Sequence, residues 1–295
     1  MTIVRLQGGL GNQMFQYAIG RRLALLHQVD LKLDLTELLD RTAKSNFTFR
    51  EYELNAFQIN SLIAEVEEVS LFYRNDIVSK IKRLFIPAKL IQESSLNFEP
   101  AILNSGNQVY LNGYWQSEKY FESIRTVLLS DFTLRQSFLD KHTADEGITT
   151  IKTQIETTPS VSVHFRRGDY ITDSITNSVH GTCTADYYRN AINLIRQKVA
   201  SAHLFLFSDD PEWLLKNRLF NDLPTTVVTT SNKHLDMYLM SLCQHNIIAN
   251  SSFSWWGAWL NRNPEKLVIA PEKWFANGNM NDQTTDLIPE KWIRI

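Results

Sequence analysis

Short apolar segments followed by helix-like segments recur along this chain, and this alternation constrains the fold more than any other feature. Residues 3–6 and 29–35 have the pattern of strands, and residues 12–27 between them repeat apolar side chains at helical spacing. Residues 161–165 and 203–208 begin the same pattern again. A strand, a helix and a strand in succession form the unit of a parallel sheet, so the sequence predicts an α/β fold.

Further elements are expected on the same grounds. The helix over 12–27 should bury one face, formed by Phe15, Ala18, Ile19, Leu23 and Leu26. A second series of elements is predicted as a helix over 186–200 capped by Thr184 or Asp186, a helix over 235–243, a strand over 246–250, a helix beginning at 254 and a last strand over 267–271. Residues 36–110 show only mixed helix and loop signals.

A length of 295 residues suggests two domains, because single domains usually have roughly 100–200 residues. We expect an N-terminal α/β domain over residues 1–157 and a C-terminal one over residues 158–295. Ligands of open α/β sheets bind beyond the carboxyl ends of the strands. This rule selects the stretches that follow Leu6, Phe165, Phe207 and Ala249.

The composition narrows the class of protein. The net charge is −2, which argues against a broad nucleic-acid surface. The two cysteines, Cys183 and Cys243, form neither a disulfide framework nor a zinc set. We see no secretion signal and no stretch of ~18 apolar residues, so a cytoplasmic location is expected. Residues 79–91 are basic and apolar, and could make a weak peripheral membrane contact through Lys80, Lys82, Arg83 and Lys89 or form a core-facing helix broken at Pro87.

The stretch QGGLGNQM (7–14) places three glycines and two amides before a helix. A dinucleotide-binding turn would need a third spaced glycine where Met14 stands, although Asp30 is suitably spaced for a ribose contact, and a P-loop would need a lysine. The turn can be purely structural. It can also bind a neutral polar group or one phosphate at the helix N-terminus.

The stretch VHFRRGDY (163–170) places two adjacent arginines at the end of a strand. A guanidinium grips phosphate oxygens with two parallel hydrogen bonds and can stabilise a departing diphosphate. Arg166 has the parity of His164 and Arg167 the opposite parity, so one arginine can hold phosphate while the other pairs with a carboxylate such as Asp169. The alternative is an Arg–Asp pair that only fixes a turn at Gly168.

Two further polar stretches follow strands. In the stretch Ser208–Asp210, a carboxylate can accept hydrogen bonds from the N1–H and 2-amino group of guanine or from ribose hydroxyls, but a helix cap before Pro211 is the stronger interpretation. The serines of NSSFSWWGAWL (250–260) precede a helix and could form an uncharged phosphate cradle, whereas its three tryptophans are more typical of a core. The chain contains neither a D-x-D triplet nor an H-E-x-x-H motif, so arginines in place of a metal ion form the coherent interpretation.

Four stretches together resemble one family. GGLGNQMFQYA (8–18), HFRRGDY (164–170), FSDD (207–210) and NSSFSWWGAWL (250–260) are similar to motifs of bacterial α-1,2-fucosyltransferases, glycosyltransferase family 11. The resemblance implies a GT-B-like fold, with two Rossmann-type domains facing across a cleft. It implies an acceptor-side first domain, a second domain that binds GDP-β-L-fucose, inversion at the anomeric carbon, no metal, and transfer to O2 of a terminal galactose.

The resemblance also assigns roles to residues. It implies that Arg166 grips the pyrophosphate, that His164 and Asp209 lie near the nucleotide, and that the glycine turn closes over the sugar from the other domain. The donor-binding residues so expected are Gly9, Gly11, Asn12, Gln13, His164, Arg166, Arg167, Ser208, Asp209, Asn250, Ser251, Ser252, Phe253 and Ser254.

The catalytic base and the acceptor stay open at this point. Asp169 is the first candidate for the base and Asp34 the second, although a highly dissociative reaction needs no strong base. The expected acceptor is a galactose-terminated oligosaccharide, carried by a lipid-linked surface-glycan or O-antigen precursor and contacted by neutral groups such as Tyr114 and Trp115. An NAD-dependent oxidoreductase and a non-catalytic glycan-binding protein are the alternatives.

Overall fold

The computed structural model of the chain describes residues 1–42, 49–73, 89–142, 146–167, 178–179, 181–217, 222–230, 232–276 and 278–295. These residues divide into two compact units, Met1–Thr133 and Leu134–Ile295. The division comes earlier in the chain than the boundary that we expected at residue 157. Residues 146–157 are instead a continuous helix of the second unit, α7 (Glu146–Thr157), which contacts strand β6 (Ser160–Phe165) and helix α12 (Lys233–Leu242).

The described part of the first unit contains a five-stranded parallel sheet with the order β3-β2-β1-β5-β4. Its strands are β1 (Thr2–Arg5), β2 (Leu31–Asp34), β3 (Leu62–Ile63), β4 (Lys89–Gln92) and β5 (Val109–Asn112). Its helices are α1 (Leu10–His27), α2 (Thr36–Leu39), α3 (Val66–Tyr73) and α5 (Arg125–Asp131), with short 3-10 turns η1 (Leu54–Ala56), η2 (Pro100–Asn104), η3 (Glu118–Tyr120) and η4 (Glu122–Ile124).

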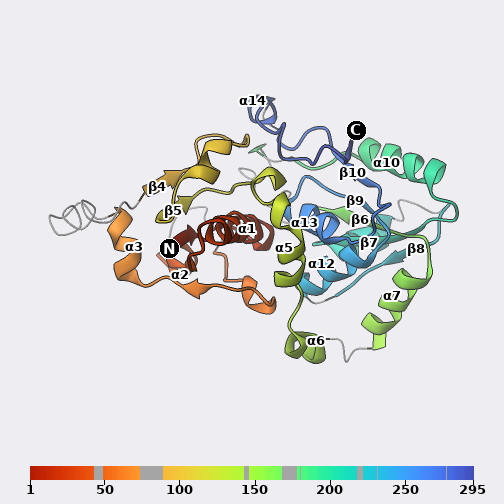
Figure 1. Ribbon diagram of the computed structural model, residues 1–295. Coiled ribbons are helices and arrows are strands. Elements are labelled where there is room, and N and C mark those ends of the chain that lie inside the picture. The colour runs from red at the N-terminus through yellow and green to blue at the C-terminus, as the bar shows by residue number, and fades with distance from the viewer. Residues whose placement is uncertain are drawn as a thin grey trace. The chain divides into compact units, whose positions relative to one another are not determined.

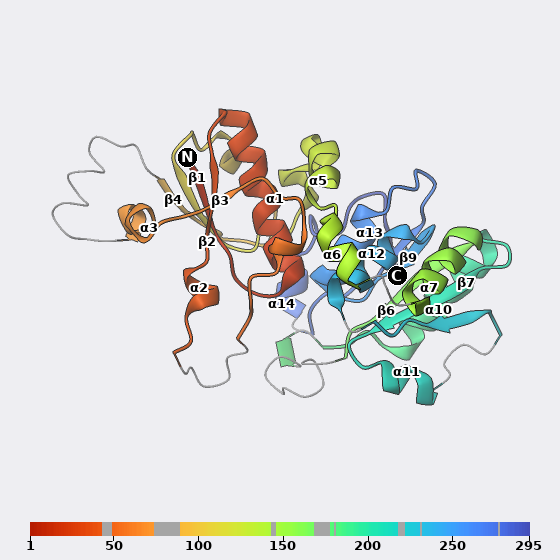
Figure 2. The same cartoon turned by 90° about the horizontal axis from the view of Figure 1, so that it is seen from below.

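Helix α1 lies along strands β1 and β2, as Figure 2 shows. The close approach requires Gly20, because a Cβ atom there would lie 2.4 Å from a methyl group of Val4. The expected apolar face of α1 is buried from Phe15 to Leu23, but Leu26 is 43% exposed, so that part of the prediction was wrong. The helix ends at His27, one residue after Leu26, and its last turn extends beyond the sheet-facing stripe.

The described part of the second unit contains a six-stranded parallel sheet with the order β11-β10-β9-β6-β7-β8. Besides β6, its strands are β7 (His203–Ser208), β8 (Thr225–Val227), β9 (His245–Ile247), β10 (Val268–Ala270) and β11 (Ile293–Arg294). Besides α7 and α12, its helices are α6 (Gln136–His142), α10 (Ala185–Lys198), α11 (Pro211–Asn217), α13 (Ser252–Leu260) and α14 (Gly278–Asn281), labelled in Figure 1 where space allows.

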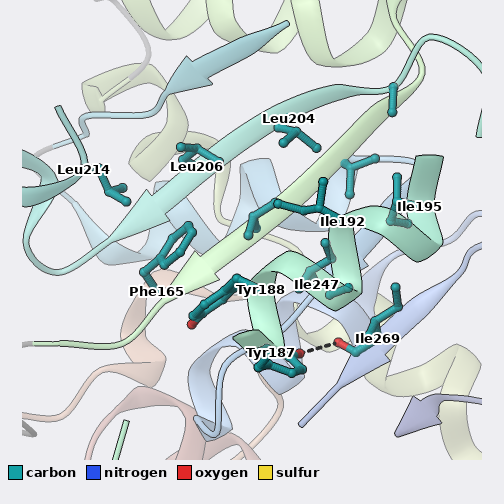
Figure 3. Packing of buried hydrophobic residues seen from close by; sticks show 14 residues of the cluster. Phe165, Tyr187, Tyr188, Ile192, Ile195, Leu204, Leu206, Leu214, Ile247 and Ile269 are labelled. Atoms are coloured by element: carbon teal, nitrogen blue, oxygen red, sulfur yellow. Dashed lines mark hydrogen bonds between the residues drawn. The ribbon is translucent and has the colours of Figure 1, made fainter. Parts of the chain in front are cut away.

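The two faces of this second sheet pack differently. Alternate residues of β6, such as Val163 and Phe165, join a core cluster with Tyr188 and Ile192 of α10, which Figure 3 shows together with the neighbouring strands. The intervening residues face the other way. Ser162 accepts a hydrogen bond from Asn246 of β9 at 2.7 Å, and Asn246 also donates to the Met240 carbonyl of α12.

The α/β class with two Rossmann-type units of the GT-B-like kind is confirmed, and Thr184 caps α10 by accepting from the Tyr187 N–H. Trp255, Trp256 and Trp259 are buried, as expected of core residues. The strand over 267–271 is not the last, because β11 pairs with β10. Residues 36–110 contain β3, β4 and the start of β5, and residues 79–88 lie outside the described residues.

Candidate functional site

The polar stretches of the second unit meet at the carboxyl edge of its sheet. Strand β6 lies between β7 and β9, with Phe165 opposite Ser208 and Val163 opposite Ile247. The segments that follow these three strands therefore begin side by side, as the rule for parallel sheets requires. They contain the two arginines, the pair of aspartates and the serine-rich turn.

Asp209 joins the end of β7 to the end of β6. One of its carboxylate oxygens lies 2.8 Å from Nη1 of Arg166, and the other accepts the backbone N–H of Arg167 at 2.9 Å. The Arg166 and Asp209 side chains are both about a quarter exposed, at 23% and 25%. This pairing fixes the direction of the Arg166 guanidinium while leaving it within reach of a ligand.

Arg167 is held on the opposite side, against helix α11. Its guanidinium carbon lies 3.8 Å from the centre of the Trp213 ring, and its Nε donates to Asp210 at 3.4 Å. Asp210 also accepts the Trp213 N–H, which makes it the cap of α11. The two aspartates therefore have different roles. Asp210 caps α11, and Asp209 binds the Arg166 guanidinium and the Arg167 backbone.

His164 is buried at the end of β6. Its ring lies 5.5 Å from that of Phe253 on α13, and its Nδ1 has no hydrogen-bond partner among the described residues. Burial lowers the pKa of His164 to about 4, opposed by the nearby Asp209 and reinforced by Arg166. The imidazole is therefore neutral at physiological pH, and its 3% exposure limits any direct contact with a ligand.

The serine-rich turn begins helix α13. Ser251 caps the helix by accepting the Phe253 N–H at 3.3 Å, and Ser254 is buried and donates to backbone carbonyls, whereas Ser252 and Phe253 stay partly exposed. Asn250 donates to the carbonyls of Gly181 and Trp274, so its amide ties three segments together. Of this stretch, Ser252 and Phe253 are the side chains placed to meet a ligand.

The glycine turn of the first unit is held mainly by its own amides. Gly8 has φ +75°, and a Cβ atom there would lie 2.5 Å from the amide nitrogen of Asn12. Gln13 is buried, donates to the carbonyls of Gly8 and Glu51, and accepts the N–H of Glu53. Gln13 therefore has a structural role, and the side chain of Asn12 accepts a hydrogen bond from Gln116 at 2.8 Å. Gly9, at the N-cap of α1, is partly exposed, whereas Gly11 is buried.

Of the two candidate catalytic bases, Asp34 lies among the described residues and Asp169 does not. Asp34 is buried at the end of β2, where one carboxylate oxygen accepts from the N–H and hydroxyl of Thr36 and the other accepts from the Tyr110 hydroxyl. Burial and this contact with Asp34 raise the pKa of Tyr110.

Sequence reasoning missed two residues at these sheet edges. Trp213 stands three residues after Asp210, and this spacing gains a meaning only from the structure, in which Asp210 caps α11 and Arg167 stacks on the Trp213 ring. Glu93 follows β4 in a region without a clear pattern, and its carboxylate accepts the N–H groups of both Tyr114 and Trp115. Burial raises the pKa of Glu93, although these two hydrogen bonds lower it.

Two negative findings concern the described residues only. They contain no group of three or more His, Cys, Asp or Glu side chains arranged to hold a metal ion. None of the helices in the described ranges is both long and apolar enough to cross a membrane. Requirements for a metal and the location in the cell therefore stay predictions.

Each unit is built on a parallel sheet, and in the second unit two adjacent arginines and a serine-rich helix start follow strands of that sheet. The model of one family, glycosyl transferase family 11, matches residues 1–295. The chain belongs to this family.

Known relatives agree with this assignment. An α-1,2-colitosyltransferase of Escherichia coli is 34% identical over 100% of this chain and 99% of its own length. The O-antigen biosynthesis glycosyltransferase WbnK of E. coli is 35% identical over 98% and 99%. A galactoside 2-α-L-fucosyltransferase of Caenorhabditis elegans is 25% identical over 89% and 70%. Among solved structures, a mutant of Arabidopsis thaliana FUT1 in complex with GDP has a TM-score of 0.50 at 10% identity, over 91% and 70%, which shows a shared fold.

Proposed function

We propose that the protein transfers L-fucose from GDP-β-L-fucose to O2 of a terminal galactose, with inversion at the anomeric carbon and without a metal ion. One observation carries the proposal: Asp209 binds the guanidinium of Arg166 and the backbone of Arg167 together. It thereby holds a partly exposed cation at the carboxyl end of a central strand, where α/β sheets of this kind bind nucleotides.

The chemistry follows from the charge that develops. The galactose O2 attacks C1 of fucose while the bond from C1 to the β-phosphate oxygen breaks, and the bonding electron pair leaves with GDP. The hydroxyl proton passes to a carboxylate or to solvent. Arg166 stabilises the growing charge on the diphosphate through its fork of N–H donors, and the N-terminus of α13 adds the positive end of a helix dipole.

A second donor is favoured by one relative, the α-1,2-colitosyltransferase. Colitose is fucose without its 3-hydroxyl group, so the two donors differ at one position of the sugar. A site that hydrogen-bonds this hydroxyl would reject colitose by roughly 10⁴–10⁵, whereas an apolar site would reject fucose by only ~10². The donor choice therefore depends on which kind of contact O3 meets.

The acceptor that we propose is a galactose-terminated oligosaccharide on a lipid-linked O-antigen precursor. Support comes from the O-antigen glycosyltransferase relative and from the galactoside fucosyltransferase relative. Contact with a membrane surface through residues 79–91 stays a prediction, because most of that segment lies outside the described residues.

A donor panel tests the proposal. Purified protein is incubated with GDP-fucose or GDP-colitose and with lactose or a galactosyl-N-acetylglucosamine, and the linkage of the product is determined by NMR. We expect α-1,2-fucosyl-lactose. A strong preference for GDP-colitose would identify GDP-colitose, not GDP-fucose, as the donor. Exclusive transfer to glucosamine would contradict the proposal that the acceptor is galactose. Binding of galactosides without transfer or release of GDP from either donor indicates a non-catalytic glycan-binding protein.

A further inference from the structure

We propose that the turn 113–116 after strand β5 is a binding site for a neutral hexopyranose, with the Tyr114 ring as its stacking surface and Glu93 as the residue that positions it. The inference rests on the proposed function, because it assigns the acceptor sugar to this turn. Nothing in the family match or in the relatives' names identifies these residues.

The turn has an unusual backbone. Trp115 has φ +59°, in the left-handed region that large side chains rarely adopt. Its ring is fully buried, and its indole N–H has no hydrogen-bond partner among the described residues. Both features are unfavourable, and such strain persists only where surrounding contacts enforce it, which is most often at functional sites.

Glu93 supplies the enforcing contact. Its two carboxylate oxygens accept the N–H of Tyr114 at 2.7 Å and the N–H of Trp115 at 2.8 Å. Gly113 makes room for this arrangement, because a Cβ atom there would lie 2.3 Å from the Cβ of Glu93. The carboxylate therefore replaces the hydrogen bonds that a regular turn would make within its own backbone.

The turn is also tied to the glycine stretch. Gln116 donates to the side-chain oxygen of Asn12 at 2.8 Å, and Gln16 of α1 donates to the carbonyl of Gly113 at 3.1 Å. The two segments that follow β1 and β5 therefore form one connected edge, because these strands are neighbours in the sheet. The amides of the glycine stretch hold this edge in place.

The left-handed backbone at Trp115 places the Tyr114 and Trp115 side chains in different surroundings. While the Trp115 ring is buried, Tyr114 is 38% exposed. Partial burial raises the pKa of the Tyr114 hydroxyl, reinforced by Glu93 and Glu37, so the ring stays neutral at all physiological pH values. A half-exposed aromatic ring fixed by its backbone loses little entropy when it stacks on the apolar face of a pyranose.

The Glu93 carboxylate beside the Tyr114 ring determines which class of sugar the site suits. Each oxygen of Glu93 can accept more than one hydrogen bond, so a sugar hydroxyl can share it with a backbone N–H. A ring face next to a hydrogen-bond acceptor suits a neutral pyranose such as galactose, whose one face is apolar and whose rim carries hydroxyl groups. An anionic sugar would be repelled by the carboxylate.

The experiment measures binding without a donor, so it stands even if neither GDP-sugar is transferred. Methyl β-galactoside is titrated against the full-length protein by saturation-transfer-difference NMR. We expect Tyr114→Phe to keep the affinity within about twofold and Tyr114→Leu to weaken it about tenfold, as for the loss of one stacked ring. The matched control is Tyr73→Leu, because Tyr73 is a tyrosine of the same unit with 42% exposure.

A second variant tests the positioning role. In Glu93→Gln the amide nitrogen faces a backbone N–H, so the turn should loosen and the affinity for galactoside should fall, while the affinity for GDP stays unchanged. The galactoside KM should rise more than kcat falls. Unchanged galactoside affinity in Tyr114→Leu, or an equal loss in Tyr73→Leu, overturns the site. A parallel loss of GDP affinity in Glu93→Gln overturns the positioning role.

Discussion

The Arg167 guanidinium stacks on Trp213, with 3.8 Å from its central carbon to the centre of the ring. Asp210 fixes both partners, since it accepts from Arg167 Nε and from the Trp213 N–H. The neighbouring Arg166 is paired with Asp209 instead. Two arginines that are adjacent in sequence therefore have different surroundings, and we expect different roles for them: Arg166 meets the diphosphate, and Arg167 fixes the backbone that presents it.

Removing the ring should test this division of roles. Trp213→Leu should weaken GDP affinity by about 3- to 30-fold, the range of a cation–π contact, and Trp213→Phe should retain most of it. Leu215→Ala is the control, because Leu215 lies on the same helix and is exposed. Calorimetric titration with GDP provides the measurement. Equal affinities in all three variants would show that Trp213 does not position Arg167.

Arg166 should matter most for turnover. Arg166→Ala should lower kcat/KM by at least 10²–10³, the usual cost of one donor at a developing negative charge. Arg166→Lys should recover little, since an ammonium lacks the planar fork. Initial rates with GDP-fucose measure the effect, and the free energy of unfolding confirms that each variant is folded. Activity above about a tenth of wild type, a difference of only ~1.4 kcal/mol, contradicts the assignment.

Chelation should leave the reaction intact. If Arg166 and the start of α13 carry the charge of the diphosphate, enzyme treated with EDTA should transfer fucose within about twofold of the untreated rate. The measurement compares metal-stripped enzyme with and without added Mn²⁺ or Mg²⁺. Recovery of a lost activity by either ion would overturn the arginine-based mechanism.

Asp34 distinguishes a structural carboxylate from a catalytic one. Because Thr36 and Tyr110 donate to its two oxygens, Asp34→Asn should lower the free energy of unfolding by about 1–3 kcal/mol. A catalytic base should instead lose kcat, with GDP affinity and stability little changed. Urea unfolding and initial rates, measured on the same protein, separate the two outcomes. Asp169→Asn is the parallel test of the other candidate.

The sequence predicted the central strands of the second sheet and missed the two-residue strands at the sheet edges. Strand β6 has apolar residues at alternate positions and β7 has an apolar run over 204–207, so both patterns indicate strands. Strand β3 has only two residues, both exposed, and therefore has no hydrophobic signature. Strand β11 likewise has two residues, one of them a partly buried isoleucine, and it is recognisable only by its pairing with β10.

The sequence predicted which residue types of the candidate site stand at the ends of strands. It did not predict which of these side chains contact one another. The rule for parallel sheets placed the arginines and the aspartates on one edge. It could not show that Arg166 pairs with Asp209, which is distant in sequence, because side-chain pairing depends on strand register. The amides of Gln13 and Asn250 illustrate the same limit: both looked available to a ligand, and both instead donate to backbone carbonyls.

His164 should make the stability of the protein depend on pH. Burial lowers its pKa to about 4 in the folded protein, against an ordinary value of 6.5. Between these values the unfolded chain binds a proton that the folded chain does not, so the free energy of unfolding falls as the pH drops from 6.5 towards 4. At about 1.4 kcal/mol per unit of pKa, the full effect is at most ~3 kcal/mol.

The contribution of His164 is measured by how steeply the free energy of unfolding changes with pH, not by its value at one pH. His164→Asn has no proton to gain, so its free energy of unfolding should fall less steeply than that of wild type between pH 6.5 and 4. His203→Gln is the matched control, because the pKa of His203 is also lowered by burial but its side chain is only partly buried. We therefore expect its slope to change less than that of His164→Asn. Urea unfolding at four or five pH values gives the slopes. Parallel curves for wild type and His164→Asn would mean that the buried imidazole is not neutral in the folded protein, and that it carries its charge beside Arg166.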